Sequence, residues 1–284
     1  MGLRARLRRL IEVTGYTVHK IAPSIPDATD INSCAEDEAC SSAVDAPDPY
    51  PTYNQDGLKS IHNHDFMDDP SFRRAYDRGC QAASDYNWHW RVHIGLWAGF
   101  TASKIPGDFV ECGVNRGFLS SAIMEFLNWN SQNRVFYLLD TFEGLDLRYV
   151  SDDDLKHGAL EKNEVAKNSG FYVSGADSVQ DNFSEWDNVK IIQGSIPDTL
   201  EQVESREIAY VHLDMNCSPP EVAALEFFWD RMSPGAIILL DDYAYRTYEA
   251  QKYAMDEFAR QKNVMIASLP TGQGLLQKPP EVVT

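Results

Sequence analysis

The stretch Gly107-Asp-Phe-Val-Glu-Cys-Gly-Val-Asn-Arg-Gly117 joins a short apolar run, a carboxylate and spaced glycines. The apolar residues suit a buried strand, Glu111 stands at its carboxyl end, and Gly113 permits a tight turn. Gly117 then lets the following segment, residues 118–128, approach the strand closely as a helix. The stretch therefore predicts a strand, a turn and a helix, and the rest of the chain is interpreted around this unit.

The glycine spacing distinguishes this unit from a dinucleotide site. The dinucleotide fingerprint has glycines two and then three residues apart, whereas Gly113 and Gly117 are four apart and Glu111 stands in place of the first glycine. An acid at that place would repel a pyrophosphate, and it suits a ligand with a ribose or a cationic amino-acid portion. S-adenosylmethionine is such a ligand. The alternative is an ordinary strand-turn-helix that binds nothing.

Length, charge and cysteine usage bound the class of protein. The 284 residues suit one sizeable α/β core with accessory segments. A formal net charge of −18 argues against a nucleic-acid partner, because phosphate backbones are bound by basic patches. The five cysteines are scattered without a Cys-x-x-Cys pair, so they indicate neither a disulfide framework nor a zinc site, and a cytoplasmic location is expected.

The chain divides into four expected segments. Residues 1–20 are basic with leucines at helical spacing, and predict an amphipathic helix that either contacts an anionic membrane surface weakly or is solvated or docked on the domain. Residues 21–58 gather acids among Pro, Ser and Ala and predict a disordered linker. Residues 59–104 are aromatic and helical in pattern and predict a helical accessory segment, and residues 105–284 predict the main domain.

Strands alternate with helices through the main domain, which is typical of a Rossmann-like, doubly wound, mostly parallel α/β sheet. After the first strand, further strands are expected at 134–140, 189–193, 208–214 and 236–241. The final stretch predicts an antiparallel hairpin, residues 264–268 and 275–277, at one edge of the sheet. Four of the five parallel strands end in an acid, and ligands of such sheets bind outside the carboxyl ends of the strands. These acids are Glu111, Asp140, Asp214 and Asp241.

Asp140 begins the motif Asp140-Thr-Phe-Glu-Gly144 after the second strand. A carboxylate there can accept both ribose hydroxyls of a nucleoside in charge-assisted hydrogen bonds. It arrives about thirty residues after Glu111, near the separation that nucleoside-binding folds require. We favour the ribose role over the alternative of a helix-capping Asp.

Three acids end the fourth and fifth strands: Asp214, Asp241 and Asp242. Adjacent strands lie about 4.8 Å apart, so the three carboxylates can converge, and unpaired they would raise one another's pKa. A divalent cation resolves this conflict, and oxygen-only ligands suit magnesium or manganese. The alternative is that one Asp caps a helix and another forms a salt bridge. The next residues, Ser218-Pro-Pro-Glu221, predict a capping box at the start of a helix.

Two further groups are weaker candidates. His157 lies in a polar insertion, residues 151–170, that could cover the site, although a solvated loop histidine is the alternative. Trp90, Arg91 and His93 are candidates to border the cofactor, with plain core packing as the alternative.

Taken together, the motifs resemble the macrocin O-methyltransferase family (TylF/MycF type) of S-adenosylmethionine-dependent sugar O-methyltransferases. The likeness extends over about residues 105–262. It rests on the opening stretch and on four later motifs: Asp140-Thr-Phe-Glu-Gly-Leu145, Gly194-Ser-Ile-Pro-Asp-Thr-Leu200, Val211-His-Leu-Asp214 and Ser233-Pro-Gly-Ala-Ile-Ile-Leu-Leu-Asp-Asp-Tyr243.

The resemblance implies a class I methyltransferase fold, magnesium held by Asp214, Asp241 and Asp242, and catalytic roles for Asp214 and Asp241. The family's catalytic histidine lies in the insertion, which makes His157 the candidate here. Asn216-Cys217-Ser218 replaces a run in which family members usually carry a second Asp. The implied cofactor contacts are Glu111, Gly113, Asn115, Gly117, Asp140, Thr141, Phe142, Gly194 and Ser195.

We therefore expect an S-adenosylmethionine-dependent, magnesium-assisted O-methyltransferase that acts on a hydroxyl of a sugar or another small polyol. A catechol-type O-methyltransferase and a non-catalytic module that binds the cofactor are the alternatives. The sequence leaves a homo-oligomer open and does not identify the acceptor.

Overall fold

The computed structural model describes residues 53–280 of the chain. The helix expected at residues 1–20 and nearly all of the linker expected at 21–58 lie outside the described residues. The linker prediction is wrong at its end, because Tyr53–Gln55 form a strand, β1, that pairs antiparallel with β2 (Leu58–Ser60). The pair is a short hairpin separate from the main sheet.

The main sheet has seven strands in the order β5-β4-β3-β6-β7-β9-β8. The first five pair in parallel, and β9 runs antiparallel to both β7 and β8, so the doubly wound sheet and its antiparallel edge are confirmed. The strand bounds are β3 (Asp108–Cys112), β4 (Phe136–Asp140), β5 (Val189–Gln193), β6 (Ile208–Leu213), β7 (Met232–Leu240), β8 (Ala267–Ser268) and β9 (Gly274–Gln277).

The strand order reverses between β3 and β6. From β3 the sheet continues through β4 and β5 in one direction, and β6 and β7 extend it in the other. In such sheets the carboxyl ends on either side of this switch point form a crevice for ligands. The register brings Glu111 of β3 opposite His212 of β6, and Leu213 of β6 opposite Leu240 of β7. The acids that follow these strands therefore meet at one edge of the sheet.

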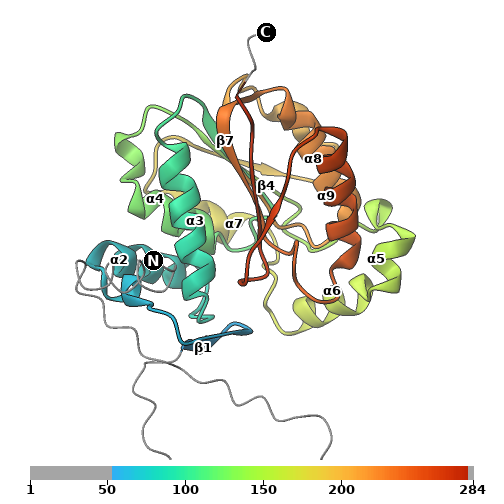
Figure 1. Cartoon of the computed structure of the whole chain (residues 1–284), viewed down its shortest axis with the longest axis horizontal. Helices are drawn as coiled ribbons and strands as arrows, with labels where there is room; N and C mark the ends of the chain where they lie inside the picture. The colour runs from blue at the N-terminus through green and yellow to red at the C-terminus, as the bar shows by residue number, and fades with distance from the viewer. Residues whose placement is uncertain (1–52, 281–284) are drawn as a thin grey trace, which may run out of the picture. The chain divides into compact units, whose positions relative to one another are not determined.

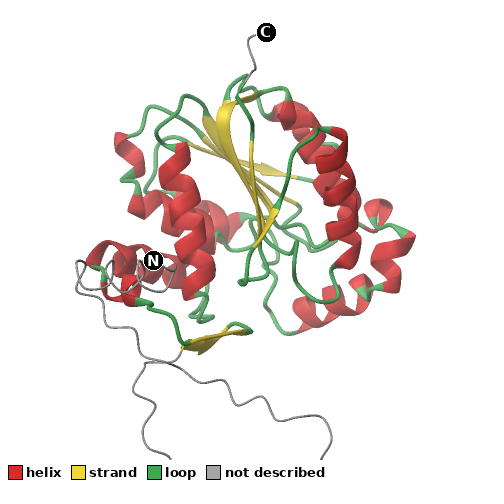
Figure 2. Ribbon diagram, viewed as in Figure 1, coloured by secondary structure: helices red, strands yellow, loops and turns green. Residues whose placement is uncertain are grey.

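Helices cover both faces of the sheet, as Figures 1 and 2 show. One apolar cluster lies between the sheet and the helices α3 (His89–Ala102), α4 (Phe118–Phe126) and α7 (Asp177–Phe183), and α2 (Pro70–Ala82) packs on α4. The other cluster lies under α8 (Ser218–Trp229) and α9 (Glu249–Gln261). Buried faces on both sides explain the nearly continuous apolar runs of the parallel strands.

The insertion after β4 folds into two short helices, α5 (Asp152–Lys156) and α6 (Ala159–Asn168). Ser151 and Asp154 form a reciprocal capping box at the start of α5. Short 3₁₀ helices lie at Asp65–Asp68 (η1), Trp129–Ser131 (η2), Leu147–Tyr149 (η3) and Leu200–Gln202 (η4).

The capping box expected at Ser218 is wrong. Helix α8 begins after Cys217, whose side chain makes no capping bond. Asp154 of the insertion instead accepts hydrogen bonds from the backbone N and the Oγ of Ser218, at 3.1 and 3.0 Å, and Glu221 accepts one from the backbone N of Met215. A tertiary contact has replaced the local one. Within the described part of the chain, no helix combines the length and the apolar character needed to cross a bilayer.

Candidate active site

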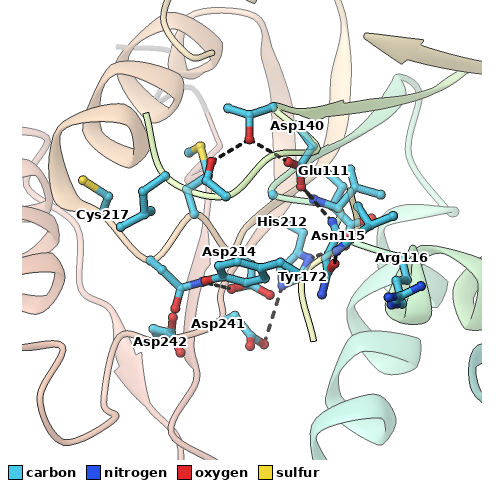
Figure 3. Close-up of a pocket in the computed structure, with 18 of the residues that line it drawn as sticks. Glu111, Asn115, Arg116, Asp140, Tyr172, His212, Asp214, Cys217, Asp241 and Asp242 are labelled. Atoms are coloured by element: carbon cyan, nitrogen blue, oxygen red, sulfur yellow. Dashed lines mark hydrogen bonds and ion pairs between the residues drawn. The ribbon is translucent and has the colours of Figure 1, made fainter. Parts of the chain in front are cut away.

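A pocket of about 330 Å³ opens at the carboxyl ends of the strands around the switch point. This volume falls within the range of small-molecule sites. Its lining includes the acids at the ends of β3, β4, β6 and β7, and it also includes residues from the hairpin, α3 and the segment after the insertion. In Figure 3, Asp140 lies at one end of the drawn side chains, and Asp241 and Asp242 lie toward the other.

The turn after β3 passes very close to the end of β6. Gly113 has a φ of +91°, and a Cβ atom added there would lie 1.9 Å from the carbonyl oxygen of Asp214, so only glycine fits. Gly117 has a different role. It is not among the pocket-lining residues, and an added Cβ atom would lie 2.4 Å from the ring of Phe183, so this glycine serves helix packing. The cofactor contact expected at Gly117 has no support in this geometry.

Asp140 holds the turn after β3. One carboxylate oxygen accepts hydrogen bonds from the backbone N atoms of Val114 and Asn115, both at 2.7 Å, and the other accepts one from the backbone N of Phe142, also at 2.7 Å. The expected ribose contact would have to share these oxygens. It stays a prediction, and the observed role of Asp140 is to join the ends of β3 and β4.

Asn115 uses its side chain to hold the segment after the insertion. Its Nδ2 donates to the carbonyl oxygen of Phe171 at 3.1 Å, and its Oδ1 accepts from the backbone N of Val173 at 2.9 Å. Phe171, Tyr172 and Val173 line the pocket, so this segment forms one of its walls. The remaining predicted cofactor contacts also line the pocket: Thr141, Phe142, Gly194 and Ser195.

His212 is a functional candidate that the sequence analysis missed. Its Nδ1 lies 2.8 Å from Oε1 of Glu111, and its Nε2 lies 3.6 Å from Oδ1 of Asp241. Burial alone would lower the pKa of His212, but the carboxylates of Asp241 and Glu111 raise it to about 10, so the imidazole is a cation at neutral pH. The signal lay in the spacing, because residues two apart on a strand face the same side and His212 precedes Asp214 by two.

Asp241 is the best-paired acid of the group. It accepts hydrogen bonds from Nη1 of Arg91 at 2.5 Å and from Nε2 of Gln273 at 2.9 Å. Burial opposes ionisation, but the charges of Arg91 and His212 hold the pKa of Asp241 below its ordinary value. Each carboxylate oxygen has two lone pairs, so these bonds leave Asp241 able to accept a further ligand.

Asp214 and Asp242 are less well compensated. Burial and the charge of Asp241 raise the pKa of Asp242 to about 7, and burial with the charges of Asp241 and Asp242 raises that of Asp214. Oδ2 of Asp242 is buried and has no hydrogen-bond partner among the described residues. An orphaned carboxylate oxygen beside two other acids fits a bound cation.

Three side chains bring candidate metal-ligand atoms together at this end of the pocket. Single ligand atoms of His212, Asp214 and Asp241 lie within 4.8 Å of one another. Ligation by His212 would require loss of the proton that Glu111 and Asp241 stabilise. Asp242 is not in this group, so the distances support Asp214 and Asp241 as ligands, with His212 as their charge partner, and ligation by Asp242 stays a prediction that rests on its orphaned oxygen.

A second orphaned oxygen lies on the other side of His212. Glu111 lines the same pocket, and its Oε2 is buried without a hydrogen-bond partner among the described residues. A buried acceptor without a donor fits a ligand that brings one, such as an ammonium group. This observation fits the amino-acid portion of S-adenosylmethionine.

His157 is not among the pocket-lining residues. Its Nδ1 lies 2.7 Å from the carbonyl oxygen of Asp153, and its Nε2 lies 3.7 Å from a carboxylate oxygen of Glu249. A base role for His157 therefore has no support in the geometry. Of the three aromatic-segment candidates, Arg91 lines the pocket, whereas Trp90 and His93 are not among its lining residues.

Residues 97–269 match the family model for macrocin O-methyltransferase (TylF). The chain belongs to this family. The matched part contains the five parallel strands, their terminal acids and the antiparallel edge strand β8 up to Ser268.

Curated relatives of the chain include antibiotic-modifying enzymes. One is the 8-demethyl-8-(2,3-dimethoxy-alpha-L-rhamnosyl)-tetracenomycin-C 4'-O-methyltransferase of Streptomyces olivaceus, 30% identical over 148 residues, which are 50% of this chain and 55% of the relative. Another is the mycinamicin III 3''-O-methyltransferase of Micromonospora griseorubida, 28% identical over 49% of this chain and 56% of the relative. The matches thus span about half the length of these relatives.

Two solved structures share the fold. The O-methyltransferase NovP superposes with a TM-score of 0.58 at 20% identity, over 67% of this chain and 80% of that one. The calicheamicin methyltransferase CalS11 does so with a TM-score of 0.53 at 16% identity, over 76% of this chain and 94% of that one. These superpositions confirm the expected class I methyltransferase architecture.

Proposed function

We propose that this protein is an S-adenosylmethionine-dependent, magnesium-assisted O-methyltransferase that acts on a hydroxyl of a sugar. The observation that carries the proposal is one pocket with two orphaned carboxylate oxygens, Oε2 of Glu111 and Oδ2 of Asp242. The two oxygens suit two different ligands, an ammonium group and a metal ion, and His212 lies between Glu111 and Asp241, the neighbour of Asp242 in the chain.

The cofactor would lie on the side of β3 and β4. Glu111 offers an acceptor for the ammonium group, and Gly113 lines the pocket where the turn after β3 passes close to the backbone of Asp214. Asp140 holds the amides of the turn and lies where the ribose is expected. Thr141, Phe142, Gly194 and Ser195 would complete this side.

Asp214, Asp241 and Asp242 would hold the metal on the side of β6 and β7. When bound, the metal supplies a Lewis acid for the hydroxyl and S-adenosylmethionine supplies the methyl group. The protein holds the two reactants together, and oriented groups can recover about 7–11 kcal/mol of the barrier. Burial, with the charges of Asp214 and Asp242 respectively, raises the pKa of Tyr172 and Tyr248, so both phenols stay neutral in the wall of the pocket.

The sugar acceptor is supported by the family and by the relatives, whose names place their methyl groups on positions 4' and 3'' of glycosylated antibiotics. Trp88, Tyr245 and Tyr248 line the pocket and offer flat apolar faces of the kind that ligand sites use. A cytoplasmic location, a homo-oligomer and weak membrane contact through residues 1–20 remain proposals from the sequence.

Binding and turnover test the proposal directly. Calorimetry should show binding of S-adenosylmethionine and its demethylated product, and mass spectrometry should show a 14 Da gain on a glycoside from a panel in the presence of magnesium, which a strong chelator abolishes. Binding of NAD in place of both sulfur nucleosides would refute S-adenosylmethionine as the cofactor. Tight cofactor binding without transfer to any hydroxyl acceptor would favour the non-catalytic module.

The metal corner has its own test. Asp242→Asn removes the charge beside the orphaned oxygen at nearly constant shape. We expect it to abolish the stimulation by magnesium while leaving the affinity for the demethylated cofactor within about twofold, because Glu111 and Asp140 lie on other strands. Glu226→Gln removes an exposed acid of α8 and serves as the control. Full turnover of the Asp242→Asn variant in the presence of a chelator would rule out a role for the metal.

A further inference from the structure

The turn of the β1–β2 hairpin reaches the pocket. Asp56 and Gly57 form this turn with φ values of 49° and 70°, and an Asp-Gly pair suits such a two-residue turn. Asp56 lines the same pocket as the acids of β6 and β7. A two-stranded hairpin is marginally stable by itself, so its position depends on what anchors it.

The hairpin is anchored at both ends. Near its start, Tyr53 is 4% exposed, packs edge-on against the rings of His89 and Trp90, and donates a hydrogen bond to the carbonyl oxygen of Asn87. At the turn, Asp56 accepts a hydrogen bond from the hydroxyl of Tyr245 at 3.1 Å. The second anchor ties the hairpin to the loop that follows β7.

Arg91 joins Asp56 to Asp241. Its Nε and Nη2 donate to the two oxygens of Asp56 at 3.2 and 3.3 Å, and its Nη1 donates to Oδ2 of Asp241 at 2.5 Å. The guanidinium lies 5.0 and 5.1 Å from the ring centroids of Trp88 and Tyr245. The planar fork of Arg thus reaches two carboxylates that are 185 positions apart in the chain.

Because Arg91 and Asp241 are both buried, loss of either side chain would disturb the position of the other. Arg91 is 8% exposed and Asp241 is 4% exposed. In a buried ion pair, removal of one partner leaves the charge of the other uncompensated, so that side chain is no longer held in one position. Without Asp56, Arg91 would lose two of its donor bonds, and the direction in which it holds Asp241 would no longer be fixed.

We propose that Asp56 and Arg91 are positioning residues of the methyl-transfer site: Asp56 fixes the hairpin turn and Arg91, and Arg91 fixes the carboxylate of Asp241. The hairpin is thereby one wall of the acceptor side of the pocket. This inference rests on the proposed function for the role of Asp241, whereas the link between hairpin and site is independent of it.

Two variants test the link in the full-length protein. Asp56→Asn keeps the shape of the turn and removes the charge, and Arg91→Lys keeps the charge but cannot span both carboxylates. Two matched controls alter comparable contacts away from the pocket. Asp256→Asn changes a carboxylate of α9 that likewise accepts from a tyrosine hydroxyl, that of Tyr243. Arg78→Lys changes an arginine that pairs with Glu185 and lies over the ring of Trp186.

Three measurements separate positioning from general stability. Hydrogen exchange of the peptide covering residues 53–60 reports the hairpin, electron paramagnetic resonance of free Mn²⁺ reports the metal corner, and calorimetry reports affinity for the demethylated cofactor. We expect both variants to speed exchange of the hairpin and to weaken Mn²⁺ binding about tenfold, the equivalent of one hydrogen bond to a charged group. Cofactor affinity should stay within about twofold, and the acceptor KM should rise more than kcat falls.

The outcomes are distinguishable. Hairpin exchange, Mn²⁺ affinity and acceptor KM that equal those of the two controls would overturn the inference. A wild-type protein that binds neither Mn²⁺ nor the cofactor would instead refute the proposed function, and hairpin exchange in Arg91→Lys would still decide whether Arg91 holds the hairpin.

Discussion

Gly113 shows how closely two strand ends approach at the site. Gly113→Ala should destabilise the fold by several kcal/mol, because the added Cβ atom would lie 1.9 Å from backbone that cannot move aside. Gly170→Ala is the matched control, since Gly170 also has a positive φ, +74°, but has no atoms within 4 Å of an added Cβ. It should cost only about 1–2 kcal/mol of backbone strain. Urea unfolding of both variants measures the difference, and equal losses would show that the close approach does not matter.

Asp140 links two turns through three backbone hydrogen bonds. Asp140→Ala should weaken binding of the demethylated cofactor by about 1.5–3 kcal/mol, the scale of a hydrogen bond to a charged group. Asp187→Ala removes an exposed acid that is not among the pocket-lining residues and should leave the affinity nearly unchanged. Calorimetry on the two variants distinguishes a specific contact from the loss of charge, which would affect both alike.

At the scale of single residues, the sequence predicted the acids better than their partners. Glu111, Asp140, Asp214, Asp241 and Asp242 all line one pocket, because strand ends of a parallel sheet can be located from apolar runs. Their partners come from distant segments of the chain, and no local sequence pattern predicts that Arg91 contacts Asp241. His157 does not line the pocket for a related reason: the sequence places it in the insertion but does not show which way the insertion folds.

At the scale of elements, two histidines of α3 carry a pH dependence. Burial lowers the pKa of both His89 and His93. The ring of His93 stacks on that of Phe66, with 4.1 Å between the ring centroids. A depressed pKa means that the stability is present above the unfolded value of about 6.5 and is lost as the pH falls through the folded pKa. These two histidines therefore lower the free energy of unfolding as the pH decreases below about 6.5, whereas the raised pKa of Asp242 acts in the opposite direction.

The contribution of His93 can be isolated. In His93→Phe, which keeps a ring against Phe66, the decline of the unfolding free energy below pH 6.5 should be shallower. Chemical denaturation between pH 5 and 8 measures the slope. His62→Phe alters an exposed histidine and is the control. A slope in His93→Phe as steep as in the wild type would mean that burial of this imidazole does not affect stability.

The parallel strands and the antiparallel edge of the sheet were predicted closely, whereas the start of β7 and the cap of α8 were not. The bounds predicted for residues 189–193 are those of β5, because an apolar run between turn signals leaves little freedom. β7 begins at Met232 instead of Ala236, since Pro234-Gly235 resembles a turn but continues the strand. The cap of α8 could not be predicted, because Asp154 reaches Ser218 only in the folded chain.

At the scale of the whole molecule, the hairpin sets the boundary of the folded unit. Removal of residues 1–48 should leave the melting temperature within about 2 °C, because the acidic composition of residues 21–48 disfavours a packed core. Removal of residues 1–60 should lower the melting temperature by several degrees, because the contacts of Tyr53 and Asp56 with α3 are lost. Differential scanning calorimetry compares the two truncations, and a large loss from the shorter one would refute the linker proposed there.

The match to the family begins at residue 97, six residues after Arg91 and well beyond Asp56. In the proposed function the cofactor side lies within the shared part of the fold, whereas Asp56 and Arg91, which line the same pocket and are proposed to form its acceptor wall, precede that part. Exchange of residues 53–96 between relatives would change the acceptor wall while retaining the five shared motifs, which makes this short segment a natural target for altering which hydroxyl is methylated.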